Sequence, residues 1–379
     1  MVHRLYEKII AEQMRLDNRI IIIYGPRQVG KTTLARLIIE KFEGKILQIN
    51  ADDVDYADVL SSRSLNKMRQ LIDGYDLVFI DEAQQIPDIG INLKILYDSL
   101  PHLKIIVTGS SSFDLANKIQ EPLTGRSWIF QLMPISVSEL NLQYNRFELN
   151  NMLEDSLIFG NYPALLNIEN RELKVNYLQE IVRSYLFKDV LTIGSIKYPP
   201  KLRDLVRLLA FQIGSTVSLN ELANTLQIAR DTVQNYIDLL EKTFVIFRLS
   251  GYSRNLRKEI VRQDKIFFYD LGIRNAVIEN FAPLSNRNDG GALWENYLIV
   301  ERMKSQTYRR QGANRYYWRT YTGAELDYVE EREGLVKGFE FKFNQKIARA
   351  PQSWTETYPE AAFETINRDN YLDFLLEKT

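Results

Sequence analysis

Short apolar runs alternate with amphipathic stretches through the first 140 residues of the chain. Strands that alternate with helices in this way are typical of a parallel sheet covered by helices. Pro134 ends the pattern, so we expect an α/β fold for residues 1–140. The five apolar runs have the length of buried strands and span Ile20–Tyr24, Ile46–Asn50, Leu77–Ile80, Ile105–Thr108 and Trp128–Leu132.

Beyond Pro134 the pattern changes again. Residues 146–195 have helical periodicity and few strand signals, whereas residues 201–285 combine helices with a β-rich segment. Pro199-Pro200 and the polar, glycine-containing stretch Leu284–Gly291 mark the boundaries on either side of that second region. The sequence therefore predicts an α/β multidomain protein with four parts: residues 1–140, 141–198, 199–285 and 286–379.

Composition narrows the class of protein. The chain is 45% hydrophobic and 26% charged, as expected of a water-soluble globular protein. Its longest apolar runs match one buried strand, and charges interrupt the first sixteen residues, so neither a membrane helix nor a signal peptide is expected. The absence of cysteine excludes disulfides and thiolate metal sites. These features favour a cytoplasmic protein that does not contact a membrane.

The net charge is close to neutral, with 48 basic and 49 acidic residues. A chain-wide basic signature for nucleic acid is therefore absent, and any such binding must depend on local patches. Residues Arg248–Lys265 hold six basic and two acidic residues, and Glu301–Arg319 hold six basic and one acidic. Either patch could contact nucleic acid or could be an ordinary solvated surface.

A glycine-rich loop follows the first predicted strand and precedes a helix-forming segment. The glycines of such a loop let backbone N–H groups point at phosphate oxygens, and the helix N-terminus adds positive partial charge. Lys31 would reach the β- and γ-phosphates of ATP, and the Thr32 hydroxyl would ligate Mg²⁺. The predicted ATP-binding loop consists of Gly25, Pro26, Arg27, Gln28, Val29, Gly30, Lys31, Thr32 and Thr33.

An acidic pair ends the third apolar run. Asp81 and Glu82 follow Leu77–Ile80, and ligands of open α/β sheets bind where strands end. Asp81 would hold Mg²⁺, and Glu82 would orient and deprotonate the attacking water. A small-molecule kinase has no need of such a base, so the pair favours an ATPase over a kinase.

Two further positions are candidates for catalysis of ATP hydrolysis. Ser110, after the strand Ile105–Thr108, could be a polar sensor of the γ-phosphate, or part of an ordinary Gly-Ser turn. Arg126 could neutralise transition-state charge in its own subunit's site or in a neighbouring subunit's, or form a structural salt bridge.

The middle of the chain predicts a helix-turn-helix. Residues Glu221–Leu226 form one amphipathic helix and Arg230–Glu241 a second, in which Val233, Ile237 and Leu240 share one face. Arg230, Thr232, Gln234 and Asn235 lie on the other face and could meet DNA. The segments Phe244–Leu249 and Ile266–Tyr269 could be the strands of a wing. Winged helices also serve as protein contacts, so both interpretations stay open.

Acidic residues recur in the C-terminal part. Glu295 lies in a predicted helix, Asp327 in a strand, and Glu340 and Lys342 alternate with phenylalanines in the next strand. Alternation puts Glu340 and Lys342 on one face, beside Asp327. Asp327 and Glu340 would bind Mg²⁺ or Mn²⁺, with Lys342 stabilising charge. An amphipathic edge strand produces the same Glu-x-Lys pattern without any site.

Together these motifs resemble a family of prokaryotic AAA-type P-loop ATPases with a winged helix and a C-terminal PD-(D/E)xK nuclease-like domain of unsettled function. The matching segments are Gly25–Thr33, Phe79–Gln84, Thr108–Ser112, Leu123–Arg126, the helix-turn-helix, Gly323–Asp327 and Glu340–Lys342. The resemblance implies an ATPase core at residues 1–140, a helical lid at 141–198, a winged helix at 199–285 and a nuclease-like domain at 286–379. Gly160-Asn161 departs from the paired glycines of relatives.

Two functions remain open on the sequence. The first is an ATP-hydrolysing AAA-type ATPase coupled to nucleic-acid binding or metal-dependent cleavage, with DNA as partner and a homo-oligomer as assembly. The alternative is a nucleotide-switched regulatory or scaffold ATPase whose C-terminal domain binds a partner without cleaving it. Both require ATP and Mg²⁺.

Overall fold

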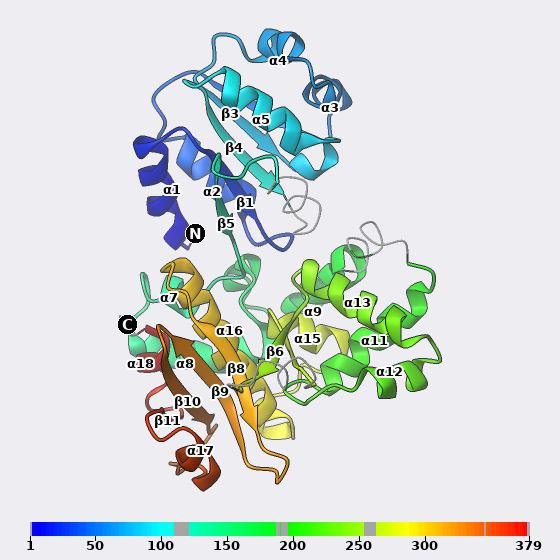
Figure 1. Cartoon of the computed structure of the whole chain (residues 1–379), viewed down its shortest axis with the longest axis vertical. Helices are drawn as coiled ribbons and strands as arrows, with labels where there is room; N and C mark the ends of the chain where they lie inside the picture. The colour runs from blue at the N-terminus through cyan, green and yellow to red at the C-terminus, as the bar shows by residue number, and fades with distance from the viewer. Residues whose placement is uncertain are drawn as a thin grey trace. The chain divides into compact units, whose positions relative to one another are not determined.

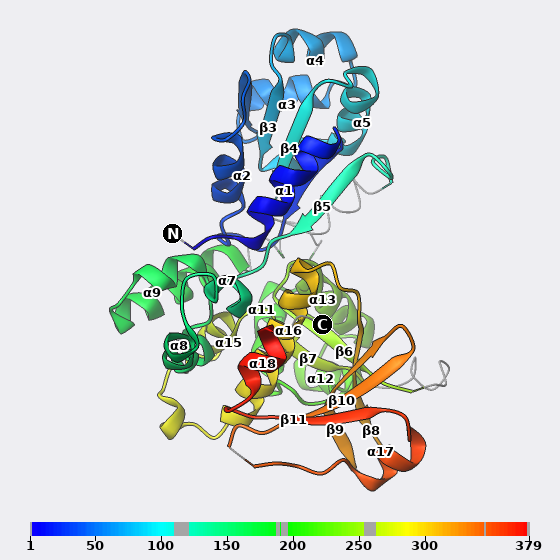
Figure 2. The same ribbon diagram turned by 90° about the vertical axis from the view of Figure 1, so that its left-hand side faces the viewer.

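The computed structural model describes residues 2–109, 121–186, 190, 196–253, 263–344 and 346–376. The chain divides into two compact units. The first unit comprises residues 1–135 with 242–244, and the second comprises residues 136–241 with 245–379. Figures 1 and 2 show the elements of each unit.

The first unit is built on a five-stranded sheet whose strands are all parallel. In spatial order the strands are β2 (Ile46–Asn50), β3 (Leu77–Asp81), β4 (Lys104–Gly109), β1 (Ile20–Tyr24) and β5 (Ser127–Gln131). All five predicted strands are confirmed, with bounds that differ by at most one residue.

Helices surround this sheet because its strands are apolar on both faces. One face packs a core that includes Ile49, Val78 and Val107 from the strands and Leu93 from a helix, all nearly inaccessible to water. The helical elements of the unit are α1 (Leu5–Leu16), α2 (Lys31–Ile39), α3 (Val54–Ser61), α4 (Leu65–Ile72), the 3₁₀ turn η1 (Ala83–Gln85) and α5 (Ile89–Ser99).

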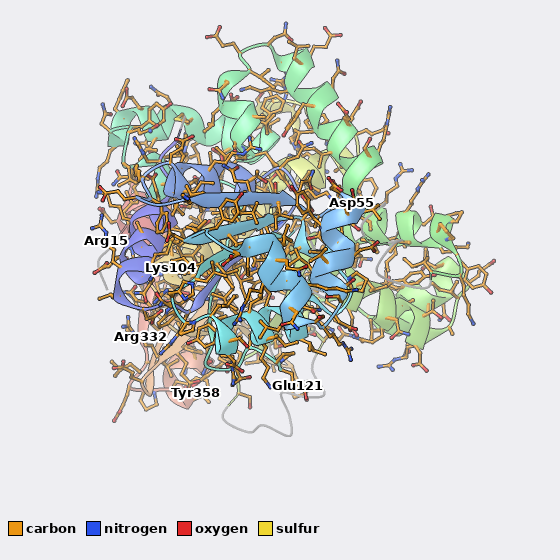
Figure 3. The ribbon with its side chains drawn as sticks, turned by 90° about the horizontal axis from the view of Figure 1, so that it is seen from above. Arg15, Asp55, Lys104, Glu121, Arg332 and Tyr358 are labelled. Carbon is orange, nitrogen blue, oxygen red and sulfur yellow. The ribbon has the colours of Figure 1, made fainter. Side chains whose placement is uncertain are left out.

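Lys104 connects α1 to the end of the sheet at which the strands begin. It is the first residue of β4, and its ammonium donates to the carbonyl oxygens of Met14 and Asp17 at the end of α1. Figure 3 labels Lys104 together with Arg15, which lies on the same end of α1. Burial lowers the pKa of Lys104, against the pull of the Asp17 carboxylate. Its charge complements the negative end of the helix.

The second unit contains a six-stranded mixed sheet in the order β11-β10-β9-β8-β6-β7. Its strands are β6 (Ile246–Gly251), β7 (Lys265–Phe268), β8 (Asn314–Arg319), β9 (Glu325–Arg332), β10 (Leu335–Phe341) and β11 (Ala362–Ile366). The β6–β8 and β10–β11 pairs are parallel, and the other pairs are antiparallel. This sheet crosses the predicted boundary between residues 285 and 286.

Helices make up the rest of the second unit. They are α7 (Val137–Leu140), α8 (Arg146–Phe159), η2 (Pro163–Asn167), α9 (Arg171–Ile181), the π-helix η3 (Val182–Leu186), α11 (Pro199–Phe211), α12 (Leu219–Leu226), α13 (Arg230–Lys242), α15 (Leu271–Val277), η4 (Leu284–Asn286), α16 (Gly290–Tyr308), α17 (Gln352–Thr357) and α18 (Tyr371–Leu376). None of the helices in the described part of the chain is long and apolar enough to cross a bilayer.

Both helices of the predicted helix-turn-helix form, as α12 and α13, and Val233, Ile237 and Leu240 are buried as expected. The predicted wing strands also form and pair antiparallel, with Ile246 opposite Phe268. However, β6 continues beyond this hairpin and pairs with β8. The hairpin is therefore one edge of the larger sheet and not a separate wing.

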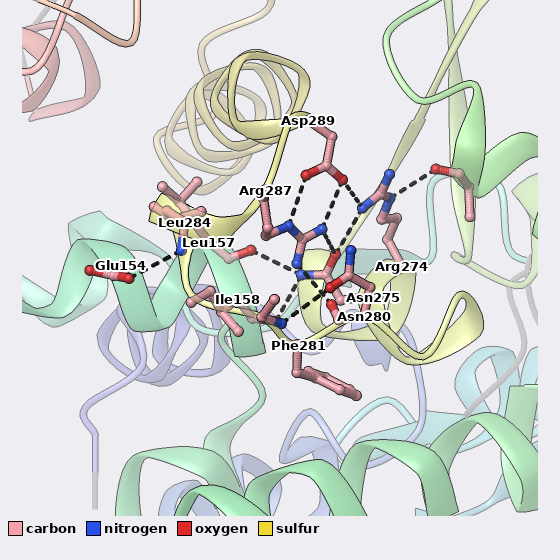
Figure 4. A network of polar contacts seen from close by, with 12 residues as sticks. Glu154, Leu157, Ile158, Arg274, Asn275, Asn280, Phe281, Leu284, Arg287 and Asp289 are labelled. Atoms are coloured by element: carbon pink, nitrogen blue, oxygen red, sulfur yellow. Dashed lines mark hydrogen bonds and ion pairs between the residues drawn. The ribbon is translucent and has the colours of Figure 1, made fainter.

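The segment expected to mark a domain boundary, Leu284–Gly291, is held in place by ion pairs. Asp289 accepts from the guanidinium groups of Arg274 at 2.6 Å and Arg287 at 2.8 Å, as Figure 4 shows. The Arg274 and Arg287 side chains are 2% and 0% exposed, and Asn275 joins both to α8 through backbone carbonyls. Two buried cations on one carboxylate are stable only if that carboxylate stays ionised.

Candidate functional site

Glycines shape the loop between β1 and α2. Gly25 has φ of 151°, and a Cβ there would come 2.0 Å from the carbonyl oxygen of Leu132. Gly30 has φ of 94° and caps α2. Side-chain-bearing residues rarely adopt these angles, so the loop needs glycine at both ends. Between them the backbone has space to curve around a phosphate group.

Lys31 begins α2 and is only 6% exposed. Its Nζ donates to the carbonyl oxygens of Gly25 at 3.1 Å and Pro26 at 2.7 Å. The charge of Lys31 is thus held within the loop itself, where the sequence predicts the phosphates of ATP to bind.

Three segments meet at the carboxylate of Asp81, the last residue of β3. Its Oδ1 accepts from the hydroxyl of Thr32 at 3.0 Å and from the hydroxyl of Thr108 near the end of β4. Thr32 and Asp81, the predicted Mg²⁺ ligands, are therefore brought together. Thr108 is a hydroxyl in an otherwise apolar strand and is 1% exposed. A single hydroxyl in an apolar run is a signal that could have pointed to Thr108 from the sequence. The polar-sensor role was predicted instead for Ser110, which lies outside the described residues.

Glu82 directly follows β3 in a left-handed conformation, with φ of 53° and ψ of 38°. Its Oε2 accepts from the side-chain amide of Gln84. A non-glycine residue in this conformation carries local strain, which tends to persist at functional sites. Glu82 thus lies, with Asp81 and Thr108, at the carboxyl ends of the strands.

Arg126 lies at the opposite end of the strands, where β5 begins. Its carbonyl accepts from Ile20 N, and it immediately precedes β5, which runs parallel to β1. Five strand residues span about 16 Å, so Arg126 is far from the loop that follows β1. The guanidinium instead pairs with Asp98 at 2.8 Å. A role in its own subunit's site does not fit this geometry, whereas the structural salt bridge that the sequence also allowed is present. A role in a neighbouring subunit's site stays a prediction.

The C-terminal candidates converge as predicted. In the β9–β10 ladder Phe339 pairs with Tyr328, so the next pair places Asp327 beside Glu340. Asp327 Oδ2 accepts from Phe341 N at 2.7 Å, and Lys342 Nζ donates to Glu340 Oε1 at 2.6 Å. Phe339 and Phe341 are buried, which leaves Glu340 and Lys342 on the opposite face.

Glu295, on α16, joins this group through a lysine that the sequence analysis had not selected. Lys265 Nζ lies 3.0 Å from Glu295 Oε1 and 2.5 Å from Glu325 Oε1. Glu325 could have been found, because it precedes Asp327 by two strand positions and so shares its face. Lys265 carried no such signal, because it lies in the segment assigned to a different domain. We call these six residues the acidic cluster: Lys265, Glu295, Glu325, Asp327, Glu340 and Lys342.

Burial governs the protonation of the acidic cluster. It raises the pKa of Glu295 to about 8, against the pull of Lys265. Burial, followed by repulsion from Glu340, raises the pKa of Asp327 to about 6. Burial lowers the pKa of Lys265, but the attraction of Glu295 and Glu325 outweighs it and raises that pKa overall. The site is therefore poised to exchange protons or accept additional positive charge.

Oxygen ligands for a divalent metal are available in the acidic cluster, but in limited number. Among the described residues, no three acidic or histidine side chains are grouped so as to hold a metal ion. Asp327 and Glu340 adjoin one another, and hard cations such as Mg²⁺ accept carboxylate and backbone oxygens with water completing the shell. The described side chains thus offer a divalent metal two adjoining carboxylates and no group of three acidic or histidine ligands.

Three family models match successive parts of the chain. Residues 17–141 match the AAA domain, residues 150–284 a domain of unknown function (DUF8612), and residues 290–366 a second one (DUF4143). The first of these covers the strands, the glycine-rich loop and the Asp81–Glu82 pair described above. Most of the first unit therefore matches the AAA domain, and we refer to this unit below as the AAA domain. The families that match the second unit assign no activity to it.

Relatives extend over most of the chain. An uncharacterised protein of Mycobacterium tuberculosis is 28% identical over 327 residues, covering 85% of this chain and 70% of its own. Another, from Methanocaldococcus jannaschii, is 25% identical and covers 94% and 81%. Domain III of the Thermotoga maritima replication initiation protein DnaA aligns with 62% of this chain at 15% identity, with a TM-score of only 0.28.

Arg4 supports the nucleotide loop of the AAA domain. It precedes α1 and is 7% exposed, and its guanidinium donates to Val29 O at 2.7 Å and Met133 O at 2.6 Å. It thereby ties the loop to the segment that follows β5. Nothing in the sequence indicates this contact, because an arginine with no recognisable motif around it is usually exposed.

Arg4→Met is expected to weaken ATP binding to the AAA domain about tenfold, because the loop loses a charged donor and two carbonyls are left buried without it. Isothermal titration with a non-hydrolysable ATP analogue measures the change. Arg15→Met, an exposed arginine on α1, is the matched control and should bind as the wild type does. Equal affinity in all three proteins would show that Arg4 does not support the loop.

Proposed function

We propose that the AAA domain binds ATP with Mg²⁺ and hydrolyses it. Lys31 would contact the β- and γ-phosphates, and Thr32 and Asp81 would hold the metal, whose charge offsets that of the phosphates. Thr108 keeps the Asp81 carboxylate oriented through its hydroxyl. Glu82 would orient and deprotonate the attacking water. The hydroxyl–carboxylate contact between Thr32 and Asp81 at 3.0 Å supports this assignment best.

We further propose that the second unit cleaves nucleic acid with Mg²⁺ or Mn²⁺. The supporting observation is that Glu295, Asp327, Glu340 and Lys342, from one helix and two strands, meet in one cluster. Asp327 and Glu340 would hold the metal, which supplies Lewis acidity and an activated water. Lys342, whose ammonium is at the more exposed side, would stabilise negative charge that develops on a phosphodiester.

Nucleic acid is the proposed partner because basic side chains lie near α13. Arg230 and Gln234 of α13 and Arg248 of β6 line a hollow of about 450 Å³. Arg248 already pairs with Glu241 at 2.5 Å and Asp238 at 3.0 Å, so Arg230 is the cation proposed to bind phosphate without reading sequence. We retain the helical lid as the proposed role of residues 141–198 and contact with DNA as the proposed role of the helix pair α12–α13. The homo-oligomer stays the proposed assembly, in which Arg126 could act on another copy.

A cleavage assay on single- and double-stranded DNA with Mn²⁺ tests the nuclease function. The wild type should cut at least one substrate, and Asp327→Ala should reduce the rate about a hundredfold or more, because the metal loses one of two carboxylates. Asp231→Ala, at an exposed position on α13, is the control. Equal cutting by wild type and Asp327→Ala would discard the assigned site.

The alternative is a nucleotide-switched scaffold. One observation favours it: Lys342 and Lys265 already form ion pairs with three of the four carboxylates in the acidic cluster. ATP turnover without cleavage of any DNA substrate is the result expected of a scaffold.

A further inference from the structure

A hollow of about 330 Å³ lies where three helices of the second unit meet, and we call it the three-helix hollow. Helix α15 packs against α9 and η3 on one side and against α11 on the other (Figure 1). Pockets for small organic ligands have volumes of roughly 300–1,000 Å³, so the hollow is large enough for one. The described residues that line it lie between positions 179 and 279, within the segment that matches DUF8612, and none belongs to the acidic cluster.

Arginines line the three-helix hollow from two of its sides. Arg203 and Arg207 lie one turn apart on α11 and so share a face of that helix, and Arg183 comes from η3. Within the described parts of the chain, the guanidinium groups of Arg183 and Arg207 form no hydrogen bond or ion pair. A guanidinium binds a phosphate group through two parallel N–H donors. These two side chains therefore supply unused donors for a phosphate.

Two carboxylates line the same hollow and do not pair with these arginines. Asp204 lies on α11, and Glu279 follows α15. The side chains of both are without a hydrogen-bond or ion-pair partner among the residues that the structure describes. Glu279 has φ of 55°, a left-handed conformation that is usually given to glycine at the end of a helix. Strain of this kind tends to persist at functional sites, and carboxylates bind the hydroxyl groups of ribose in nucleotide sites.

Apolar side chains supply the rest of the lining. Val182 of η3 and Ala276 and Val277 of α15 are buried, whereas the arginines and carboxylates are exposed. The turn that carries Val182 and Arg183 is π-helical, a rare conformation that is frequent at functional sites. A buried apolar floor with unpaired charges of both signs above it fits a ligand that has a ring, hydroxyl groups and a phosphate.

We propose that the three-helix hollow binds a nucleoside monophosphate. Arg183 and Arg207 hold the phosphate, Asp204 and Glu279 accept hydrogen bonds from the ribose hydroxyls, and the base lies against the apolar floor. This site goes beyond the proposed hydrolysis of ATP, because it belongs to the second unit. A single phosphate ester fits better than a nucleic-acid strand, because the two carboxylates repel the successive phosphates of a strand.

Isothermal titration of the full-length protein with AMP tests the proposal. A Lys31→Ala background weakens any binding of AMP to the glycine-rich loop, and one equivalent should bind to this protein. Adding Arg207→Gln should weaken AMP binding at least about tenfold, because a charged donor to the phosphate is lost. Arg349→Gln is the matched control in the same background: Arg349 is an exposed arginine of the second unit that does not line the hollow. It should leave the affinity for AMP unchanged.

Two smaller probes test the class of ligand. Adenosine has no phosphate for the arginines, and inorganic phosphate has no ribose or base for the carboxylates and the apolar floor. Each should bind at least about tenfold more weakly than AMP. Inorganic phosphate that binds as tightly as AMP would overturn the assignment of a nucleoside monophosphate.

Three other results would also overturn the proposal. The first is an affinity for AMP that Arg207→Gln does not change, and the second is the absence of AMP binding in the Lys31→Ala background. The third is a single-stranded DNA that binds more tightly than AMP and loses affinity in Arg207→Gln, because the hollow would then contact nucleic acid. ATP hydrolysis is measured separately, by phosphate release from protein that retains Lys31, so either proposal can fail without the other.

Discussion

Replacing Lys31 with alanine is expected to lower ATP turnover at least about a hundredfold. The ammonium of Lys31 lies inside the loop, where it is held by the carbonyls of Gly25 and Pro26. A preorganised cation stabilises the charge that develops on the γ-phosphate, and the loss of one such group typically costs two to three orders of magnitude, roughly 3–4 kcal/mol. Release of inorganic phosphate from ATP measures the rate.

Lys94→Ala is the matched control for Lys31→Ala. Lys94 lies on the exposed face of α5 in the same domain, so this variant should hydrolyse ATP at the wild-type rate. Turnover by Lys31→Ala within about threefold of wild type would mean that hydrolysis does not occur in the glycine-rich loop, and the ATPase assignment would fail with it.

Replacing Asp289 with alanine is expected to destabilise the second unit by about 3–5 kcal/mol. The change leaves the guanidinium groups of Arg274 and Arg287 buried without the carboxylate that both contact. Urea unfolding followed by circular dichroism measures the loss, with Asp231→Ala as an exposed control. A loss below about 1 kcal/mol would contradict the structural role that Figure 4 indicates for this group of ion pairs.

At acid pH the free energies of unfolding of wild type and Asp289→Ala should become more similar. Burial raises the pKa of Asp289, but hydrogen bonds from Arg287 and Arg274 outweigh this effect and lower the pKa to about 2. A carboxyl whose pKa is lower in the folded state stabilises the fold above its ordinary pKa, near 4, and loses that contribution as pH falls through the folded value. The difference in unfolding free energy should therefore shrink by about 2 kcal/mol between pH 5 and pH 2. An unchanged difference over that range would mean that Asp289 is not held as a carboxylate by these arginines.

Local patterns were sufficient for most of the first unit. The strands, the loop and the Asp81–Glu82 pair follow from residue order, because each depends on neighbours along the chain. The sequence left three roles open for Arg126, because its distance from the loop depends on how β5 pairs with β1 in the folded sheet. Arg4 contacts Val29 and Met133, which are distant from it in the sequence, and an arginine side chain is by default expected to be exposed.

In the second unit, too, local patterns predicted some site residues, whereas contacts between distant segments could not be predicted. Alternation along β10 was enough to place Glu340 and Lys342 on one face, and a short hairpin was enough to bring Asp327 beside them. Lys265 was missed as a site residue because it was expected only as the last residue of a basic patch, next to the wing strand Ile266–Tyr269. A boundary after residue 285 separates Lys265 on β7 from Glu325 on β9, although the folded sheet brings their charged groups to 2.5 Å.

The pairing of β6 with β8 bears on how this protein could have arisen. Ser250 and Gly251 on one side and Tyr316 and Tyr317 on the other join segments that match two different family models. If one of these two segments were exchanged without the other, the edge of β6 or of β8 would be exposed. A buried lysine or its glutamate would also lose its partner. The two segments should therefore be inherited together, and lineages that carry one should carry the other.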